Sequence, residues 1–155
     1  MSLVLEIGAP APNFRGRDQR GREIALDELT RTGPVVVYFY SKDFTPICTR
    51  EACAFRDAYE DFRELGAHVV GVSADGEATH ARFAATYQIP FSLVADEDGA
   101  IQRAFDAFRA FGLFKRRVSV VIDRAGVVRA IVNHEMLPSR HAEDVRVALR
   151  ELARR

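Results

Sequence analysis

Short apolar segments with strand character alternate along this chain with longer helical segments, and no other feature restricts the fold as much. Five segments are rich in β-branched or aromatic residues and are bounded by turn residues, as strands are. They are residues 35–40, 68–73, 91–95, 118–123 and 127–133. Segments of helical character lie between or after them, at residues 46–65, 77–88, 99–105 and 140–153. This alternation is typical of an α/β domain whose helices flank a central sheet of mostly parallel strands.

Both ends of the chain modify this arrangement. Residues 118–123 and 127–133 are separated by only a short connection, so we expect them to form a hairpin and the central sheet to be mixed. The first thirty residues are expected to contain a short N-terminal β-hairpin around residues 19–21. With 155 residues, of which 48% are hydrophobic, the chain fits a single domain over residues 1–155 that buries its own core.

Charge and hydropathy exclude several classes of protein. Lys plus Arg number 22 and Asp plus Glu number 22, and this balance indicates neither a nucleic-acid partner nor an anionic membrane surface. No apolar run approaches the roughly 18 residues that cross a bilayer. The segment from Met1 to Pro10 carries Glu6 and no basic region, unlike a signal peptide. We therefore expect a cytoplasmic protein, in a compartment that keeps thiols reduced.

The only two cysteines, Cys48 and Cys53, lie five residues apart. In a reducing compartment such a pair is more often catalytic, redox-sensing or metal-binding than structural. The spacing is not that of a zinc knuckle, and no histidine lies near either cysteine in sequence. The histidines, which we expect at the surface or at helix ends, are His68, His80, His134 and His141. We therefore expect no metal site.

Cys48 follows a strong signal for the start of a helix. Thr45 is a good N-cap residue and Pro46 suits the first helical position, so Cys48 becomes about the third residue of the helix. Its sulfur would lie beside unpaired backbone N–H groups at the positive end of the helix dipole, which stabilises a thiolate. The same position also suits a cysteine that serves only as a small buried hydrophobic residue.

Helical periodicity assigns the two cysteines to different faces. Cys48 shares an apolar face with Ala52 and Phe55, so we expect it to point inward. Cys53 shares a face with charged residues, so we expect it to point to solvent. Five helical residues correspond to about 140° of rotation and about 7.5 Å of rise, which separates the Cα atoms by roughly 8 to 9 Å. A disulfide needs a Cα separation of about 7 Å or less, so pairing requires the first helical turns to unwind.

Residues 39–57, which read F-Y-S-K-D-F-T-P-I-C-T-R-E-A-C-A-F-R-D, resemble the active-site segment of peroxiredoxins. The second cysteine, five residues after the first, is similar to that of the bacterioferritin-comigratory-protein or Q-type subgroup. Four further segments resemble family motifs in the same order. They are G-A-P-A-P-N-F at 8–14, G-V-S-A-D at 71–75, Y-Q-I-P-F-S-L at 87–93 with Asp96, and R-V-S-V-V-I-D at 117–123.

The resemblance implies a thioredoxin-like fold and the reduction of hydroperoxides with no metal and no organic cofactor. It assigns Cys48 as the peroxidatic cysteine and Cys53 as the resolving cysteine. Thr45 corresponds to the hydroxyl that holds the peroxide, and Arg117 to the cation near the thiolate. These roles suit the chemistry, because the enzyme must activate the nucleophile and stabilise charge on the leaving oxygen of a neutral peroxide. The implied reductant of the resulting disulfide is thioredoxin or a similar dithiol.

Two positions depart from the family pattern. Ser41 occupies the place of the motif's proline, which in the family helps to shape the pocket and to shield the sulfur, so we expect a wider or wetter pocket. Ile47 stands where the subgroup often has glycine. Near the implied cation, Arg116 would point to the opposite face of the strand from Arg117. Glu51 either orients Arg117 or interacts only with the helix dipole.

Three other functions fit parts of the same pattern. The first is a redox sensor, in which oxidation of Cys48 changes a partner surface and turnover is low. The second is a peroxidase with one active cysteine and an external thiol. The third is a thioredoxin-like disulfide reductase, which the five-residue spacing disfavours. No long exposed apolar strand is evident, so we expect a monomer, with a weak homodimer as the alternative.

Overall fold

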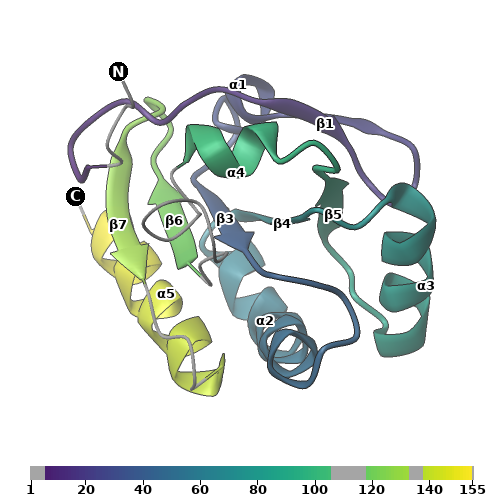
Figure 1. Cartoon of the computed structure of the whole chain (residues 1–155). Coiled ribbons are helices and arrows are strands. Elements are labelled where there is room, and N and C mark those ends of the chain that lie inside the picture. Colours follow the sequence, from purple (N-terminus) through teal and green to yellow (C-terminus); the bar gives the residue numbers. More distant parts are fainter. Residues whose placement is uncertain (1–5, 106–117, 133–137, 155) are drawn as a thin grey trace.

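The computed structural model describes residues 6–105, 118–132 and 138–154. Its centre is a five-stranded sheet in the order β5-β4-β3-β6-β7 (Figure 1). The strands are β3 (Val35–Phe39), β4 (His68–Ser73), β5 (Ser92–Ala95), β6 (Val118–Ile122) and β7 (Val128–Val132). β3, β4 and β5 run parallel, whereas β6 is antiparallel to both β3 and β7. The predicted mixed sheet with a terminal hairpin is confirmed.

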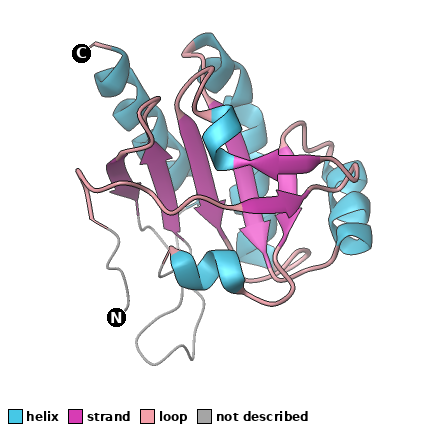
Figure 2. Ribbon diagram, turned by 90° about the horizontal axis from the view of Figure 1, so that it is seen from above, coloured by secondary structure: helices cyan, strands magenta, loops and turns pink. Residues whose placement is uncertain are grey.

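Helices cover both faces of this sheet, as Figures 1 and 2 show. The remaining elements are β1 (Arg15–Arg17), β2 (Glu23–Ala25), α1 (Leu26–Leu29), α2 (Pro46–Glu64), α3 (Glu77–Tyr87), α4 (Ala100–Ala104) and α5 (Pro138–Ala153). Val36 and Tyr38 of β3 face the core formed with α2, α3 and α5. Val35 and Val37 face a second core, formed with α1 and α4. Because both faces are covered, β3 is apolar throughout.

Element boundaries agree with the sequence-based expectations to within one or two residues. The helix predicted at 46–65 is α2, and the strand predicted at 91–95 begins one residue later, at Ser92. α5 begins at Pro138, earlier than expected, because proline is tolerated in the first turn of a helix. Among the described residues, no helix is both long enough and apolar enough to span a membrane.

The N-terminal hairpin of β1 and β2 is also confirmed, and polar contacts attach it to the edge of the main sheet. The buried carboxylate of Asp18 accepts two backbone N–H groups of the hairpin turn and the hydroxyl of Ser92. The side chain of Gln19 donates to the carbonyl of Phe91 and accepts the N–H of Leu93. The hairpin therefore satisfies backbone groups at the β5 edge, which would otherwise be unpaired.

A glycine in β4 makes room for an aromatic ring beneath the Cys48 helix. Tyr38 of β3 stacks between Tyr40 and Phe55, with ring centroids 5.4 and 4.6 Å from its own. A Cβ atom on Gly71 would lie 2.8 Å from Cζ of Tyr38 and 2.9 Å from Cδ2 of Leu93. Both separations are shorter than packed carbon atoms tolerate, so this position requires glycine.

Replacing Gly71 by alanine is expected to lower the free energy of unfolding by about 1 to 3 kcal/mol, because the added methyl group must displace Tyr38 or Leu93. For a domain of this size the melting temperature should fall by about 2 to 12 °C, which circular dichroism would measure. In a Tyr38→Leu background, Gly71→Ala should lower the free energy of unfolding by less, because the ring that crowds the added methyl group is absent. An equal cost in both backgrounds would show that crowding against Tyr38 is not the cause.

Candidate active site

Cys48 is the third residue of α2, and it is only 1% exposed. Thr45 occupies the N-cap position with an extended backbone (φ −74°, ψ 149°), and Pro46 is the first helical residue. The first turn of α2 contains no acidic residue, so no carboxylate there offsets the positive end of the helix dipole. The predicted place of Cys48 in the helix and its inward direction are therefore confirmed, and the surroundings favour a thiolate.

One polar partner of the sulfur is a residue that departs from the family motif. The hydroxyl oxygen of Ser41 lies 3.3 Å from Sγ of Cys48. A thiolate can only accept hydrogen bonds, so in the ionised form the Ser41 hydroxyl is the donor. A hydrogen bond to the charged form stabilises that form. The sequence suggested only a wider or wetter pocket at Ser41, whereas the structure makes it a direct partner of the Cys48 sulfur.

The hydroxyl of Thr45 is not used to cap the helix. It donates to the backbone carbonyl of Lys42 at 2.8 Å, and it makes no capping hydrogen bond to α2. Thr45 thus occupies the predicted N-cap position without supplying the side-chain cap that threonine commonly supplies there. Because its one proton is engaged, its oxygen can still accept a hydrogen bond from an O–H donor such as a hydroperoxide.

Cys53 lies in the same unbroken helix, and both cysteines are free thiols. Cys53 is half-buried, so the expectation that it points fully to solvent is only partly correct. The periodicity of one helix cannot show how far neighbouring elements cover its sides. In a regular helix the two Cα atoms lie roughly 8 to 9 Å apart. The folded helix therefore keeps the two cysteines too far apart for a disulfide.

Three ionisable side chains near Cys48 are buried. Glu51 of α2 is 1% exposed, so it belongs to the interior and not to the solvated face of the helix. Burial, and next the charge of Glu51, raise the pKa of Tyr38 well above its usual range. Burial is also the largest cause of the raised pKa of Tyr40. Both phenols therefore stay protonated and neutral at physiological pH.

Arg117, the predicted cation, lies outside the described residues, as does its neighbour Arg116. The described chain resumes at Val118, the first residue of β6, which pairs with Phe39 at the end of β3. Ser41 follows Phe39 by two residues in the chain. The described start of β6 therefore lies beside the strand that leads to Cys48.

A buried polar cluster that the sequence analysis missed lies in the segment before Cys48. Oδ2 of Asp43 is 2.6 Å from Nδ1 of His80, and both side chains are completely buried. The hydroxyl of Tyr40 donates to the other carboxylate oxygen at 2.6 Å. The expectation of a surface position for His80 is wrong. His80 shares one helical face with Phe83 and Tyr87, three and seven residues later, and that spacing was a usable signal of burial.

The remaining histidines have different environments. A ring nitrogen of half-buried His68 lies 2.6 Å from the hydroxyl of Thr32. His141 is completely buried, with Nε2 at 2.6 Å from the hydroxyl of Ser119, so the surface expectation is wrong for this residue too. His134 lies outside the described residues.

The polar cluster around Asp43 also has the spacing of a metal site. One ligand atom from each of Asp43, Asp75 and His80 lies within 4.8 Å of the others. These atoms already have protein partners, however. The hydroxyls of Tyr40 and Ser73 donate to the two carboxylates, and the backbone N–H of Asp43 donates to Asp75. Hydrogen bonding therefore accounts for this arrangement without an ion.

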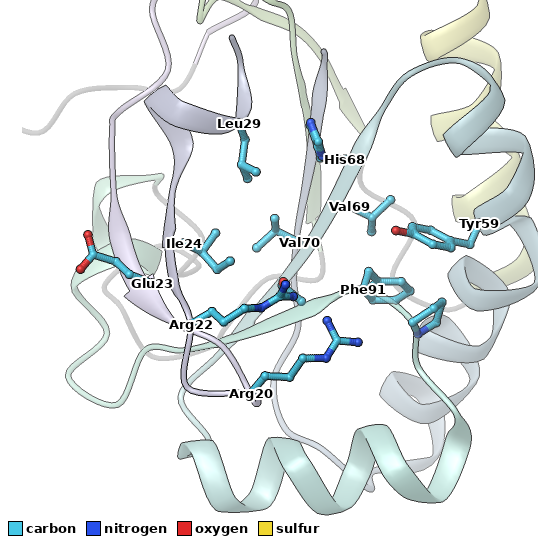
Figure 3. Close-up of a pocket in the computed structure, with 12 residues that line it drawn as sticks. Arg20, Arg22, Glu23, Ile24, Leu29, Tyr59, His68, Val69, Val70 and Phe91 are labelled. Carbon is cyan, nitrogen blue, oxygen red and sulfur yellow. The ribbon is translucent and has the colours of Figure 1, made fainter. Parts of the chain in front are cut away.

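Two cavities of the described structure are lined by neither cysteine. One, of about 350 Å³, lies between the N-terminal hairpin and the starts of β4 and β5. Figure 3 shows Arg20 and Arg22 reaching into it from the hairpin, over apolar residues that include Ile24 and Val70. The other, of about 540 Å³, lies beside the end of α5. The surroundings of Cys48 form a separate site from both.

Comparison with known sequences identifies relatives over most of the chain. The sequence pattern of the AhpC/TSA family matches residues 7–131. The chloroplastic peroxiredoxin Q of Oryza sativa subsp. japonica is 42% identical over 146 residues, which cover 94% of this chain and 67% of that protein. The chloroplastic peroxiredoxin Q of Sedum lineare is 40% identical, covering 94% of this chain and 78% of that protein.

Solved structures agree with these sequence matches. Peroxidoxin BcpB from Mycobacterium tuberculosis superposes with a TM-score of 0.88 at 32% identity, covering 96% of this chain and 98% of that one. The bacterioferritin comigratory protein of Xanthomonas campestris gives a TM-score of 0.83 at 30% identity, covering 90% of this chain and 92% of that one. The chain therefore belongs to the AhpC/TSA family and is a thiol-dependent peroxidase of the peroxiredoxin type.

Proposed function

We propose that Cys48 is the peroxidatic cysteine and that Cys53 resolves it within the same chain. The observation that carries the proposal is the position of Cys48, which is buried in the first turn of α2 beside the hydroxyl of Ser41. Backbone N–H groups at a helix start and a hydroxyl donor both stabilise a thiolate. No comparable environment surrounds the half-buried Cys53 in the middle of the helix, where backbone groups bond to one another.

The proposed reaction has three steps. The thiolate of Cys48 attacks one peroxide oxygen, the O–O bond breaks, and the other oxygen leaves and takes up a proton as water or an alcohol. The sulfur is thereby oxidised to a sulfenic acid. The thiol of Cys53 then attacks the sulfenic sulfur, which releases water and forms a disulfide. Thioredoxin or a similar dithiol returns both cysteines to thiols by exchange.

Two further residues complete the proposed site. Thr45 accepts a hydrogen bond from the O–H of the peroxide, since its own proton is held by Lys42. Arg117 stabilises the thiolate and the charge that develops on the leaving oxygen. The pairing of Val118 with Phe39 supports this role, because it brings the start of β6 next to the strand that leads to Cys48.

Multiple turnover tests the proposed function. With thioredoxin, thioredoxin reductase and excess hydroperoxide, each chain should consume many equivalents of peroxide. A redox sensor would instead react once per chain and then stop. If Cys53→Ser keeps full turnover with an external monothiol, a mechanism with one active cysteine replaces the proposed one.

The substrate class and the working state are parts of the same proposal. The Xanthomonas campestris protein has alkyl peroxide reduction activity. We propose alkyl hydroperoxides and hydrogen peroxide as the substrates of this chain, which would work as a cytoplasmic monomer. The curated relatives from plants are chloroplastic, so they do not support a cytoplasmic location. That part of the proposal rests on the sequence of this chain alone. Size-exclusion chromatography with light scattering measures the molar mass in solution and so tests whether the chain is a monomer.

Oxidation is expected to unfold the first turns of α2. Disulfide formation must bring the Cα atoms from roughly 8 to 9 Å to about 7 Å or less, which a continuous helix does not allow. Amide hydrogen exchange over residues 47–57 should therefore rise at least about tenfold in the disulfide form, while β3 stays protected. Hydrogen-exchange mass spectrometry of the reduced and oxidised protein measures this difference.

Cys53→Ser is the matched control for this experiment. It cannot form the intramolecular disulfide, so peroxide should leave its α2 protected, and excess peroxide should convert Cys48 to sulfinic acid. Equal protection of α2 in the reduced and oxidised wild-type protein would contradict resolution by Cys53.

A further inference from the structure

A buried hydrogen bond between Asp43 and His80 holds the segment that connects the sheet to the Cys48 helix. This segment, residues 40–45, is called the catalytic loop below. The carboxylate of Asp43 in this loop is 2.6 Å from Nδ1 of His80 in α3, with both side chains fully buried. The hydroxyl of Tyr40 donates to the other oxygen of Asp43 at 2.6 Å. A buried carboxylate needs hydrogen-bond partners of this kind to offset the loss of water.

Two further contacts hold the catalytic loop against the same neighbours. The backbone N–H of Asp43 donates to the carboxylate of Asp75, just before α3, at 2.8 Å. The ring of Phe44 packs edge-on against Phe83 of α3, with ring centroids 5.2 Å apart. Phe44 has a φ of 66°, which a bulky residue adopts only when its surroundings impose it. The loop is therefore kept in a specific, strained conformation by contacts with α3 and with Asp75.

We propose that His80 is a positioning residue, which holds the catalytic loop through Asp43 and thereby controls how readily the first turns of α2 unwind. The proposal rests on the proposed function, in which Cys48 reacts in the folded helix and pairs with Cys53 only after unwinding. Thr45 and Cys48 follow Asp43 by two and five residues, so movement of the loop away from α3 displaces both. The contact between Asp43 and His80 should therefore favour oxidation of Cys48 and oppose formation of the disulfide with Cys53.

His80→Leu should separate these two effects. Without His80, the buried Asp43 carboxylate keeps the Tyr40 hydroxyl but loses its hydrogen-bond partner in α3, which favours movement of the loop into water. The rate of Cys48 oxidation should fall about tenfold and the rate of disulfide formation should rise about tenfold. The thiol–disulfide equilibrium should shift about tenfold toward the disulfide, which corresponds to a reduction potential about 30 mV lower. A residue with only a general structural role would slow both steps together.

Rapid-quench mass spectrometry after addition of one equivalent of hydrogen peroxide measures both rates in one experiment. His80→Gln retains a side-chain N–H donor and should restore part of the wild-type ratio of the two rates. His68→Leu removes a histidine whose strand position pairs with Val35, at the opposite end of β3 from the catalytic loop. Val128→Ala opens a cavity in the core on the other face of the sheet and lowers general stability. Neither control should change the ratio.

A second variant keeps the proposal testable if His80→Leu does not fold. Phe44→Ala removes a ring that is 46% exposed, and it should slow oxidation and speed disulfide formation in the same way. A parallel fall of both rates, or an unchanged reduction potential, would overturn the proposal. If the wild type shows no peroxide turnover, hydrogen exchange of residues 40–48 still decides the role of His80. Faster exchange in His80→Leu supports the role, and equal exchange rejects it.

Discussion

Replacing Cys48 by serine is expected to lower peroxide turnover by at least about 1000-fold, because the reaction loses its nucleophile. A serine hydroxyl is not ionised at neutral pH, and its oxygen attacks a peroxide far more weakly than a thiolate does. The hydroxyl of Ser41 and the helix start can stabilise an existing thiolate, but they cannot supply one. A thioredoxin-coupled assay measures the loss, and circular dichroism checks that the nearly isosteric variant remains folded.

Cys53→Ser is the informative companion to Cys48→Ser. It retains Cys48, the proposed nucleophile, so it should consume the first equivalent of peroxide at the wild-type rate and then stop with thioredoxin as the only reductant. A trapping reagent for sulfenic acid should label Cys48 in this variant. Turnover that persists in Cys48→Ser would show that the assignment of the nucleophile is wrong.

Replacing Arg117 by alanine is expected to slow the oxidation of Cys48 by about 10- to 1000-fold. One charge-assisted donor to the leaving oxygen contributes about 2 to 4 kcal/mol in the transition state, which gives this range of rates. Loss of a nearby positive charge should also raise the pKa of the Cys48 thiol, so that less thiolate is present at neutral pH. Single-turnover oxidation by hydrogen peroxide measures the rate, and the pH dependence of Cys48 alkylation measures the pKa.

Arg116→Ala is the matched control for the Arg117 variant. Adjacent residues of a strand point to opposite faces of a sheet, so the sequence predicts that Arg116 and Arg117 face opposite ways. On this expectation, Arg116→Ala should change the oxidation rate by less than about twofold. If Arg116→Ala is the slow variant and Arg117→Ala is not, the assignment of Arg117 as the cation near the thiolate is wrong.

Several parts of the fold and of the site could be read from local patterns. The uninterrupted apolar residues of β3 correctly predicted a strand with both faces covered. Thr45 and Pro46 correctly predicted where α2 begins, and the apolar periodicity after them correctly predicted the inward direction of Cys48. These predictions were reliable because helix starts and amphipathic faces depend on residues within one or two turns.

Other parts of the site depend on partners that the chain supplies from a distance. Asp43 and His80 are 37 residues apart, and their contact exists only because α3 packs against the loop that follows β3. The serine that replaces the motif's proline was expected to alter the pocket, but its contact with the sulfur required the bend of the loop that carries it. The hydroxyl of Thr45 was free, in principle, to cap α2, and the loop directs it to the carbonyl of Lys42 instead.

The chain's own pattern was therefore sufficient for the α/β class, the mixed sheet and the helix that carries a buried Cys48, since each follows from periodicity and capping over short distances. Tertiary structure alone decided that Asp43 and His80 are buried as a pair, that Ser41 contacts the sulfur, and that Cys53 is half-covered. Burial of a polar residue depends on which partner the assembled core places next to it, and no local pattern encodes that neighbour.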